Sequence, residues 1–253
     1  MAVFNSTQRA FRAAATQSDV LEGGRAAMDL IASDLRGLTP SGTATNFFVI
    51  ANSTAYSPLV QTLPGSSFSR TNLLNYFFSL GRNNTKWTAV GYIVDSSSSS
   101  PLYPLYRFYA ETNTSTSPKV LYDLFANEIY NAQFTNMSHL IDGVVHLTLR
   151  AQDSNGNWIN PGYTNAANTV FVSAATPPYG SGYGEAQFFM SGHTVPAALD
   201  LELGVLEDGA LDRATSMSGN ATAQSVYLAG QAGAVHVFRQ RVTIPNVDRT
   251  AYQ

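Results

Sequence analysis

The sequence contains no cysteine, little charge and no long apolar run, and each of these absences excludes a kind of bond, binding partner or membrane segment. Without cysteine the chain has neither disulfides nor thiolate metal sites. Charged residues make up 12% of the 253 residues, about half of the usual share, and Ser, Thr, Asn and Gly replace them. The net charge of −3 provides no basic footprint for nucleic acid. No stretch reaches the roughly 18 apolar residues of a membrane span, so we expect this chain to be soluble.

The longest regular pattern covers residues 3–38, which contain no proline and many alanines. Apolar side chains recur there with the spacing of an amphipathic helix. A helix of this length would extend roughly 50 Å, bend or fray at Gly23–Gly24, and end at Gly37 and Pro40. The apolar stripe consists of Phe4, Phe11, Val20, Leu21, Ala27, Met28, Ile31 and Leu35.

After Pro40 the pattern changes to short β-prone segments bounded by turn residues. Residues 71–80 fit either a helix or a strand, and short helices are predicted at 119–132 and around 210–217. Strands are predicted at 46–51, 86–95, 104–112, 141–150, 169–173, 196–206 and 235–244.

This order of elements predicts an α+β fold in two parts, a helix at 1–38 and a β-rich globular head at 39–253. The head would cover only part of the apolar stripe. We therefore expect a partner protein to cover the rest, through Phe4, Phe11, Leu21, Met28, Ile31 and Leu35.

Several short phrases occur in one order over most of the chain. They are Ser18–Arg36, Gly91–Asp95 with Leu105–Arg107, Gly143–Arg150 with Asp153–Trp158, Val195–Leu203, and Phe238–Asn246. This order resembles that of minor pilins and pseudopilins, specifically the J type of type II secretion systems and the W type of type IV pili. Each phrase alone is short, and the resemblance rests on their order.

The resemblance implies a pilin-like fold, with one long N-terminal helix packed on antiparallel sheet. It also implies a non-catalytic subunit without a cofactor, which joins other pilins or pseudopilins at a filament tip and contacts a secreted substrate. The family's basic leader, cleavage site and membrane half-helix are missing from this sequence. We therefore expect Met1 to mark a trimmed boundary, and the full-length precursor to be anchored in the inner membrane with this part on its periplasmic or extracellular side.

Candidate metal ligands lack the spacing of a site. The four histidines, which we expect at outward or edge positions where they fall in strands, are scattered at His139, His146, His193 and His236. Asp153, Asn155 and Asn157 resemble the start of a calcium loop, but Gly156 is not at the sixth position and the distal glutamate is missing. We interpret this segment as a hairpin turn and expect no metal.

Candidate catalytic groups are equally isolated. Asp200 and Glu202 share one face of a predicted strand, about 7 Å apart, which would suit a glycosidase pair. A solvated strand face has the same pattern, however, and nothing aromatic or basic is patterned around them in the sequence. No Gly-x-Ser-x-Gly elbow occurs, and the glycines at 180–184 open no helix. The alternative to an assembly subunit is an extracellular binding module or adhesin that uses its Tyr-, Ser- and Gly-rich loops at 96–118 and 160–194.

Overall fold

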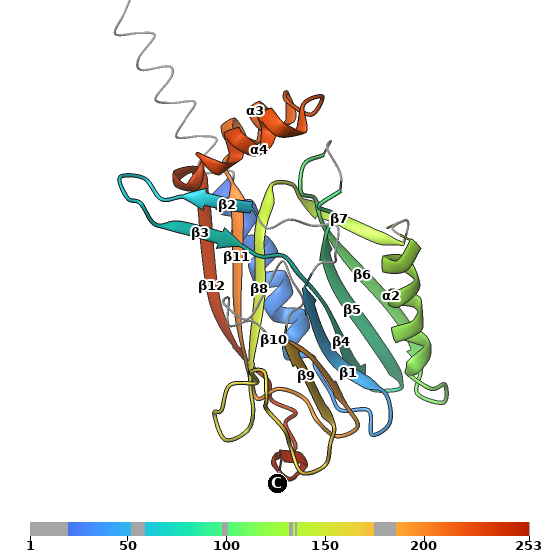
Figure 1. Ribbon diagram of the computed structural model, residues 1–253. Helices are drawn as coiled ribbons and strands as arrows, with labels where there is room; N and C mark the ends of the chain where they lie inside the picture. Colours follow the sequence, from blue (N-terminus) through green and yellow to red (C-terminus); the bar gives the residue numbers. More distant parts are fainter. Residues whose placement is uncertain are drawn as a thin grey trace, which may run out of the picture.

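The computed structural model describes residues 20–51, 59–97, 101–131, 134, 136–174 and 186–252. Within these ranges the chain forms two main antiparallel sheets, with an N-terminal helix packed against both of them (Figure 1). Short helices cover one face of the larger sheet and one end of the molecule (Figure 1).

The larger sheet has seven strands, and every neighbouring pair is antiparallel. Its central strands are rich in Phe, Tyr, Val and Ile, the residues that pack well on a pleated surface. In spatial order the strands are β7 (Met137–Ile141), β6 (Leu105–Asn113), β5 (Lys86–Val94), β4 (Asn75–Asn83), β1 (Thr45–Ala51), β10 (Ala186–Ser191) and β9 (Val170–Ala174).

The smaller sheet has three strands, in the order β12 (Val235–Thr243), β11 (Ala198–Leu206) and β8 (Val144–Gln152). Its inner face carries the alternating leucines of β11, and its outer face carries Asp200 and Glu202. A separate hairpin is formed by β2 (Leu59–Thr62) and β3 (Ser69–Asn72).

Three further α-helices complete the described elements, together with two short turns of 3-10 helix. Leu121 and Phe125 of α2 pack on the seven-stranded sheet, whereas α3 and α4 lie together at one end of the molecule beside β2 (Figure 1). The elements are α2 (Lys119–Asn131), α3 (Asp208–Thr215), α4 (Ala221–Ala229), and the 3-10 turns η1 (Ala232–Ala234) and η2 (Arg249–Tyr252).

The expectation of a pilin-like fold, in which one long helix lies on antiparallel sheet, is wrong. The N-terminal helix is described over residues 20–36, a length of about 26 Å, and the part predicted for residues 3–19 lies outside the described ranges. Strands dominate the described fold because each β-prone segment pairs with a neighbour over nearly its full length. The helix ends where expected, since Leu38 already forms a β-bridge with Gly81.

The main core lies between the two sheets and under the N-terminal helix. It includes Ile31 and Leu35 from the helix, Phe77 and Tyr92 from the larger sheet, and Leu203 from the smaller sheet. All five are completely buried. The helix therefore shares one hydrophobic core with the β-rich head.

One open prediction is decided and one needs correction. Residues 71–80, which fitted either a helix or a strand, belong mainly to strands β3 and β4. The strand predicted at 141–150 is divided, because Gly143 has a φ of +73° that ends β7 and redirects the chain into β8. The strands at 46–51, 86–95 and 196–206 and the helix at 119–132 are confirmed to within two residues.

Candidate functional site

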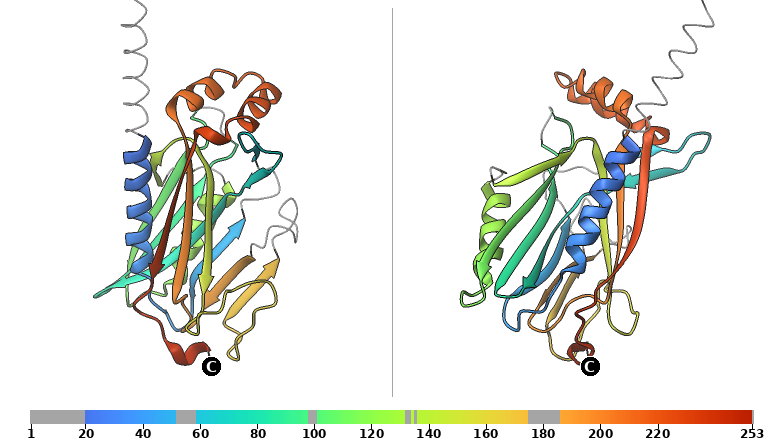
Figure 2. Two further views of the ribbon diagram at one scale, coloured as in Figure 1. Left: turned by 90° about the vertical axis from the view of Figure 1, so that its left-hand side faces the viewer. Right: turned by 180° about the vertical axis from the view of Figure 1, so that it is seen from behind.

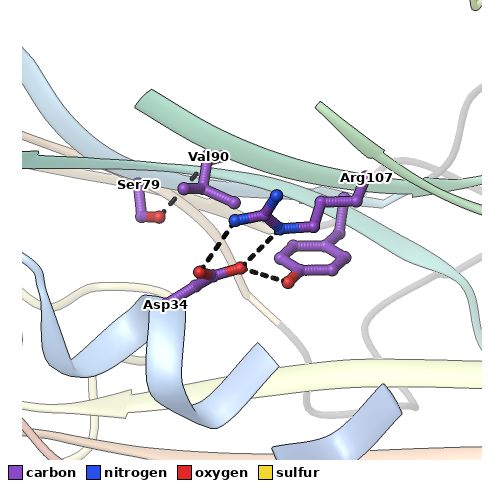
Figure 3. Close-up of polar contacts among 5 residues, drawn as sticks. Asp34, Ser79, Val90 and Arg107 are labelled. Carbon is purple, nitrogen blue, oxygen red and sulfur yellow. Dashed lines mark hydrogen bonds and ion pairs between the residues drawn. The ribbon is translucent and has the colours of Figure 1, made fainter. Parts of the chain in front are cut away.

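The N-terminal helix is fixed to the larger sheet by a partly buried ion pair. Nε of Arg107 donates to Oδ2 of Asp34 at 2.8 Å, and its Nη2 donates to Oδ1 at 3.0 Å (Figure 3). The hydroxyl of Tyr92 also donates to Oδ2 of Asp34. The exposed fractions of the Arg107 and Asp34 side chains are 19% and 14%, and a bidentate pair of this kind fixes orientation as well as distance.

The electrostatics of this cluster keep Arg107 and Tyr92 each in one protonation state. The hydrogen bonds that Arg107 donates to Asp34 raise the pKa of Arg107 above its ordinary value. Burial, followed by the charge of Asp34, raises the pKa of Tyr92. Arg107 therefore stays charged and Tyr92 stays protonated at neutral pH, so the helix is held in one register against β5 and β6.

On its other side the helix is held by close packing against β12. A Cβ atom added to Gly24 would lie 2.3 Å from Cε2 of Phe238, and the helix continues through both Gly23 and Gly24 without a break. The expected bend or fraying is therefore absent. The absence of a side chain at Gly24 allows the helix and β12 to approach closely. In a single sequence, a glycine that allows close packing looks the same as one that weakens a helix.

The structure places three of the six residues of the predicted partner stripe inside this chain. Met28 is 4% exposed and both Ile31 and Leu35 are 0% exposed, all within the main core. Leu21 is half-buried, and Phe4 and Phe11 lie outside the described residues. Met28, Ile31 and Leu35 are thus not available to a partner. The smaller sheet packs on the side of the helix where we expected a partner protein.

The exposed side of the helix carries a ridge that the sequence reasoning missed. No ion pair joins its charged members to any other described residue. The sequence already indicated this ridge, because the positions outside the apolar stripe of a helix form its exposed side. We call this set the outer ridge; it consists of Glu22, Arg25, Ala26, Asp29, Leu30, Ser33 and Arg36, all exposed.

The outer face of the smaller sheet is a charged cluster. Glu202 pairs with Arg239 at 3.2 Å, and Asp200 pairs with Arg241 at 3.6 Å. Arg70 of β3 also lies over this face, and burial lowers its pKa even though Glu202 opposes that shift. The sequence has nothing basic patterned around the two carboxylates, but β12 pairs with β11 and brings distant arginines beside them. The carboxylates are engaged in ion pairs, which gives no support to a glycosidase role.

His146 is buried beneath the β2–β3 hairpin, contrary to the outward position expected for it. Its exposed fraction is 8%, and its Nδ1 accepts a hydrogen bond of 3.0 Å from the amide of Leu73. Burial, and then the charges of Arg70 and Arg239, lower the pKa of His146 to about 3. The ring is therefore neutral at physiological pH and serves as an internal hydrogen-bond acceptor.

The remaining histidines do not form a metal site in the described part of the chain. His139 lies 2.7 Å from a carboxylate oxygen of Asp142, and His236 lies 2.9 Å from one of Glu207. His193 is exposed. Among the described residues no three His, Asp or Glu side chains cluster in a way that could hold a metal ion.

The segment from Asp153 to Asn157 is a turn, as interpreted from the sequence. Oδ1 of Asp153 accepts hydrogen bonds of 2.8 Å from the amides of both Asn155 and Asn157, and Oδ2 accepts one of 3.0 Å from the hydroxyl of Tyr163. Burial raises the pKa of Asp153, but these hydrogen bonds outweigh it and leave the pKa lowered. Both carboxylate oxygens of Asp153 therefore already accept hydrogen bonds from internal donors.

The two loops considered for ligand binding contain structural elements. The range 96–118 includes β6, and the range 160–194 includes β9 and β10. Residues 98–100 and 175–185 lie outside the described ranges. Asn165 fixes the start of the second loop, since its side chain bonds the amides of Thr169 and Val170 and the carbonyl of Ala251.

Comparison of the chain with protein-family models, with curated proteins and with solved structures gives no match. None of the helices in the described ranges is long and apolar enough to cross a membrane.

Proposed function

We propose that this chain is a non-catalytic structural subunit that joins other protein subunits through its N-terminal helix. The kind of subunit is the one that the sequence phrases resemble, a minor pilin or pseudopilin at the tip of a type IV pilus or a type II secretion pseudopilus. The native protein would then act on the periplasmic or extracellular side of the inner membrane, beside other pilins or pseudopilins and a secreted substrate.

One observation carries the proposal: the helix is locked on its inner side and charged on its outer side. The Asp34–Arg107 pair holds it to the larger sheet, and the Gly24–Phe238 contact holds it to the smaller sheet. A helix held at both flanks transmits a force on the outer ridge directly to the head. That arrangement suits a subunit that must keep a fixed position in an assembly.

The experiment places a photo-reactive amino acid at Ala26 or Ser33, the two small residues of the outer ridge, in cells that produce the protein. Both side chains are exposed, so the replacement disturbs no core. We expect both positions to crosslink to the same subunits, which mass spectrometry would identify as proteins with pilin-type leaders.

The matched control places the same amino acid at Tyr130, which is 89% exposed and belongs to α2. Figure 2 shows α2 apart from the N-terminal helix. We expect no shared adduct there. Identical adducts at all three positions, or no protein adduct at Ala26 and Ser33 in folded protein, would count against assembly through the helix.

A further inference from the structure

The free edge of β12 is the longest strand edge that no other described strand covers. β12 has nine residues and pairs only with β11, whereas the edge strands of the larger sheet, β7 and β9, have five residues each. The opposite edge of the small sheet is partly occupied, since the amide of Leu147 donates to the carbonyl of Leu73 at 2.8 Å.

The ladder between β11 and β12 determines which backbone groups of β12 point outward. The amide of Glu207 donates to the carbonyl of Ala234, and the amide of Ile244 donates to the carbonyl of Ala197. Bonded and non-bonded pairs alternate in an antiparallel ladder without a register shift. The N–H and C=O groups of Val237, Arg239 and Arg241 therefore face away from β11, and no group in the described ranges bonds them.

A hollow lies on each side of this edge. On the outer face, a hollow of about 250 Å³ is lined by Asp200, Leu201, Glu202, Arg239, Gln240 and Arg241. Toward the N-terminal helix, which runs alongside β12 (Figure 2), a hollow of about 200 Å³ is lined by Arg25, Met28, Asp29, Phe238, Arg239 and Gln240. A strand added to a sheet edge points alternate side chains to opposite faces, so its side chains would enter the two hollows in turn.

The charges around the free edge of β12 determine which side chains an added strand should carry. Four arginines (Arg70, Arg150, Arg239 and Arg241) and two carboxylates (Asp200 and Glu202) lie on the outer face, a balance of +2 on a chain of net charge −3. Glu202 faces both Arg70 and Arg239 and cannot neutralise both. An incoming strand with acidic side chains on that face would complete the neutralisation.

The same charges disfavour a second copy of this chain. Arg239 is the midpoint of β12, so antiparallel pairing of two β12 strands would place the arginines of both copies together. Like charges opposite one another destabilise a strand pair, and charged residues on an edge discourage unspecific pairing.

We propose that the free edge of β12 binds an extended segment of a different protein by strand addition. The segment carries acidic side chains toward Arg239 and Arg241, and apolar ones toward the partly buried Phe238. Backbone hydrogen bonds to the edge would provide affinity, and the two hollows would provide selectivity. This inference goes beyond assembly through the outer ridge, and its test is independent of crosslinking at Ala26 and Ser33.

The test uses an acetylated nine-residue peptide that alternates valine and glutamate, compared with a peptide in which lysine replaces glutamate. Binding is measured by fluorescence anisotropy on the purified chain. We expect the glutamate peptide to bind at least about tenfold more tightly. Hydrogen exchange should slow at the amides of Val237, Arg239 and Arg241 when the peptide is bound.

Two variants keep the test decisive. Val237→Pro removes an outward N–H that β11 does not use, so the ladder should survive and peptide binding should fall by about tenfold. Arg239→Glu with Arg241→Glu should reverse the preference toward the lysine peptide. Equal binding of both peptides, no binding of either at 1 mM, or unchanged exchange at the three amides would overturn strand addition at this edge.

Discussion

His146 should make the stability of this protein sensitive to mild acid. The groups that face it are Arg70 of β3, Arg239 of β12, Glu202 of β11 and Thr148 of β8. The pKa of His146 is about 3 in the folded chain, against 6.5 for a free imidazole. The unfolded chain therefore binds a proton between these pH values that the folded chain does not.

The sign and size follow from proton linkage. Protonation favours the unfolded chain, so the contribution of His146 is complete above pH 6.5 and is lost as the pH falls toward 3. At pH 5, which is 1.5 units below 6.5, the loss is about 2 kcal/mol.

The perturbation is His146→Asn, whose side-chain oxygen can still accept the hydrogen bond from the amide of Leu73. Free energies of unfolding are measured by urea denaturation at pH 7.5 and pH 5.0 for both chains. We expect the native chain to lose about 2 kcal/mol more than the variant over this interval. The absolute stability at pH 7.5 is not the readout, because a volume change alone alters it.

The matched control is His193→Asn, a replacement at an exposed position. It shows how much of the change any histidine replacement causes. If native and His146→Asn chains lose the same stability between pH 7.5 and 5.0, a neutral buried His146 is refuted.

Three further predictions concern the helix and the turn. Asp34→Asn should lower the free energy of unfolding in urea by about 1–3 kcal/mol because Arg107 keeps a partly buried charge without its ionised partner, and adding Arg107→Met should recover part of the loss; equal loss in both variants would contradict this. Gly23→Ala has space, since only one atom lies within 4.0 Å, and should raise Tm through about 1 kcal/mol of helix propensity. Gly24→Ala should be about 1–3 kcal/mol less stable than Gly23→Ala, as overpacking is, and calorimetry that finds the two alike would argue against the Phe238 contact. Asp153→Ala should cost about 2–3 kcal/mol in thermal unfolding because it leaves turn amides unbonded, whereas an unchanged Tm would refute a structural turn.

Several elements could be predicted from local patterns because their cause is local. The alternation of Leu199, Leu201 and Leu203 defines a half-buried strand wherever the chain places it. The short polar side chains from Asp153 to Asn157 make a turn by bonding their own backbone. The spacing of Leu121 and Phe125 similarly defines one face of α2.

The candidate site depended on contacts between residues far apart in the sequence. Asp34 meets Arg107 after 73 residues, and the arginines of β12 reach the carboxylates of β11 only because the two strands pair. An apolar stripe on a helix indicates which side chains must be buried, but not which element buries them. The packing of the smaller sheet on the helix places Met28, Ile31 and Leu35 in the core of this chain.

Local patterns in the sequence fix where most strands and α2 form, because periodicity and turn chemistry act within a few residues. Tertiary structure alone decided that the inner side of the N-terminal helix is buried, that Gly24 is a packing contact with Phe238, and that β12 presents a free edge. The physical reason is that burial, ion pairing and edge exposure depend on which elements become neighbours. That outcome is set by the packing of the whole chain and not by any one segment.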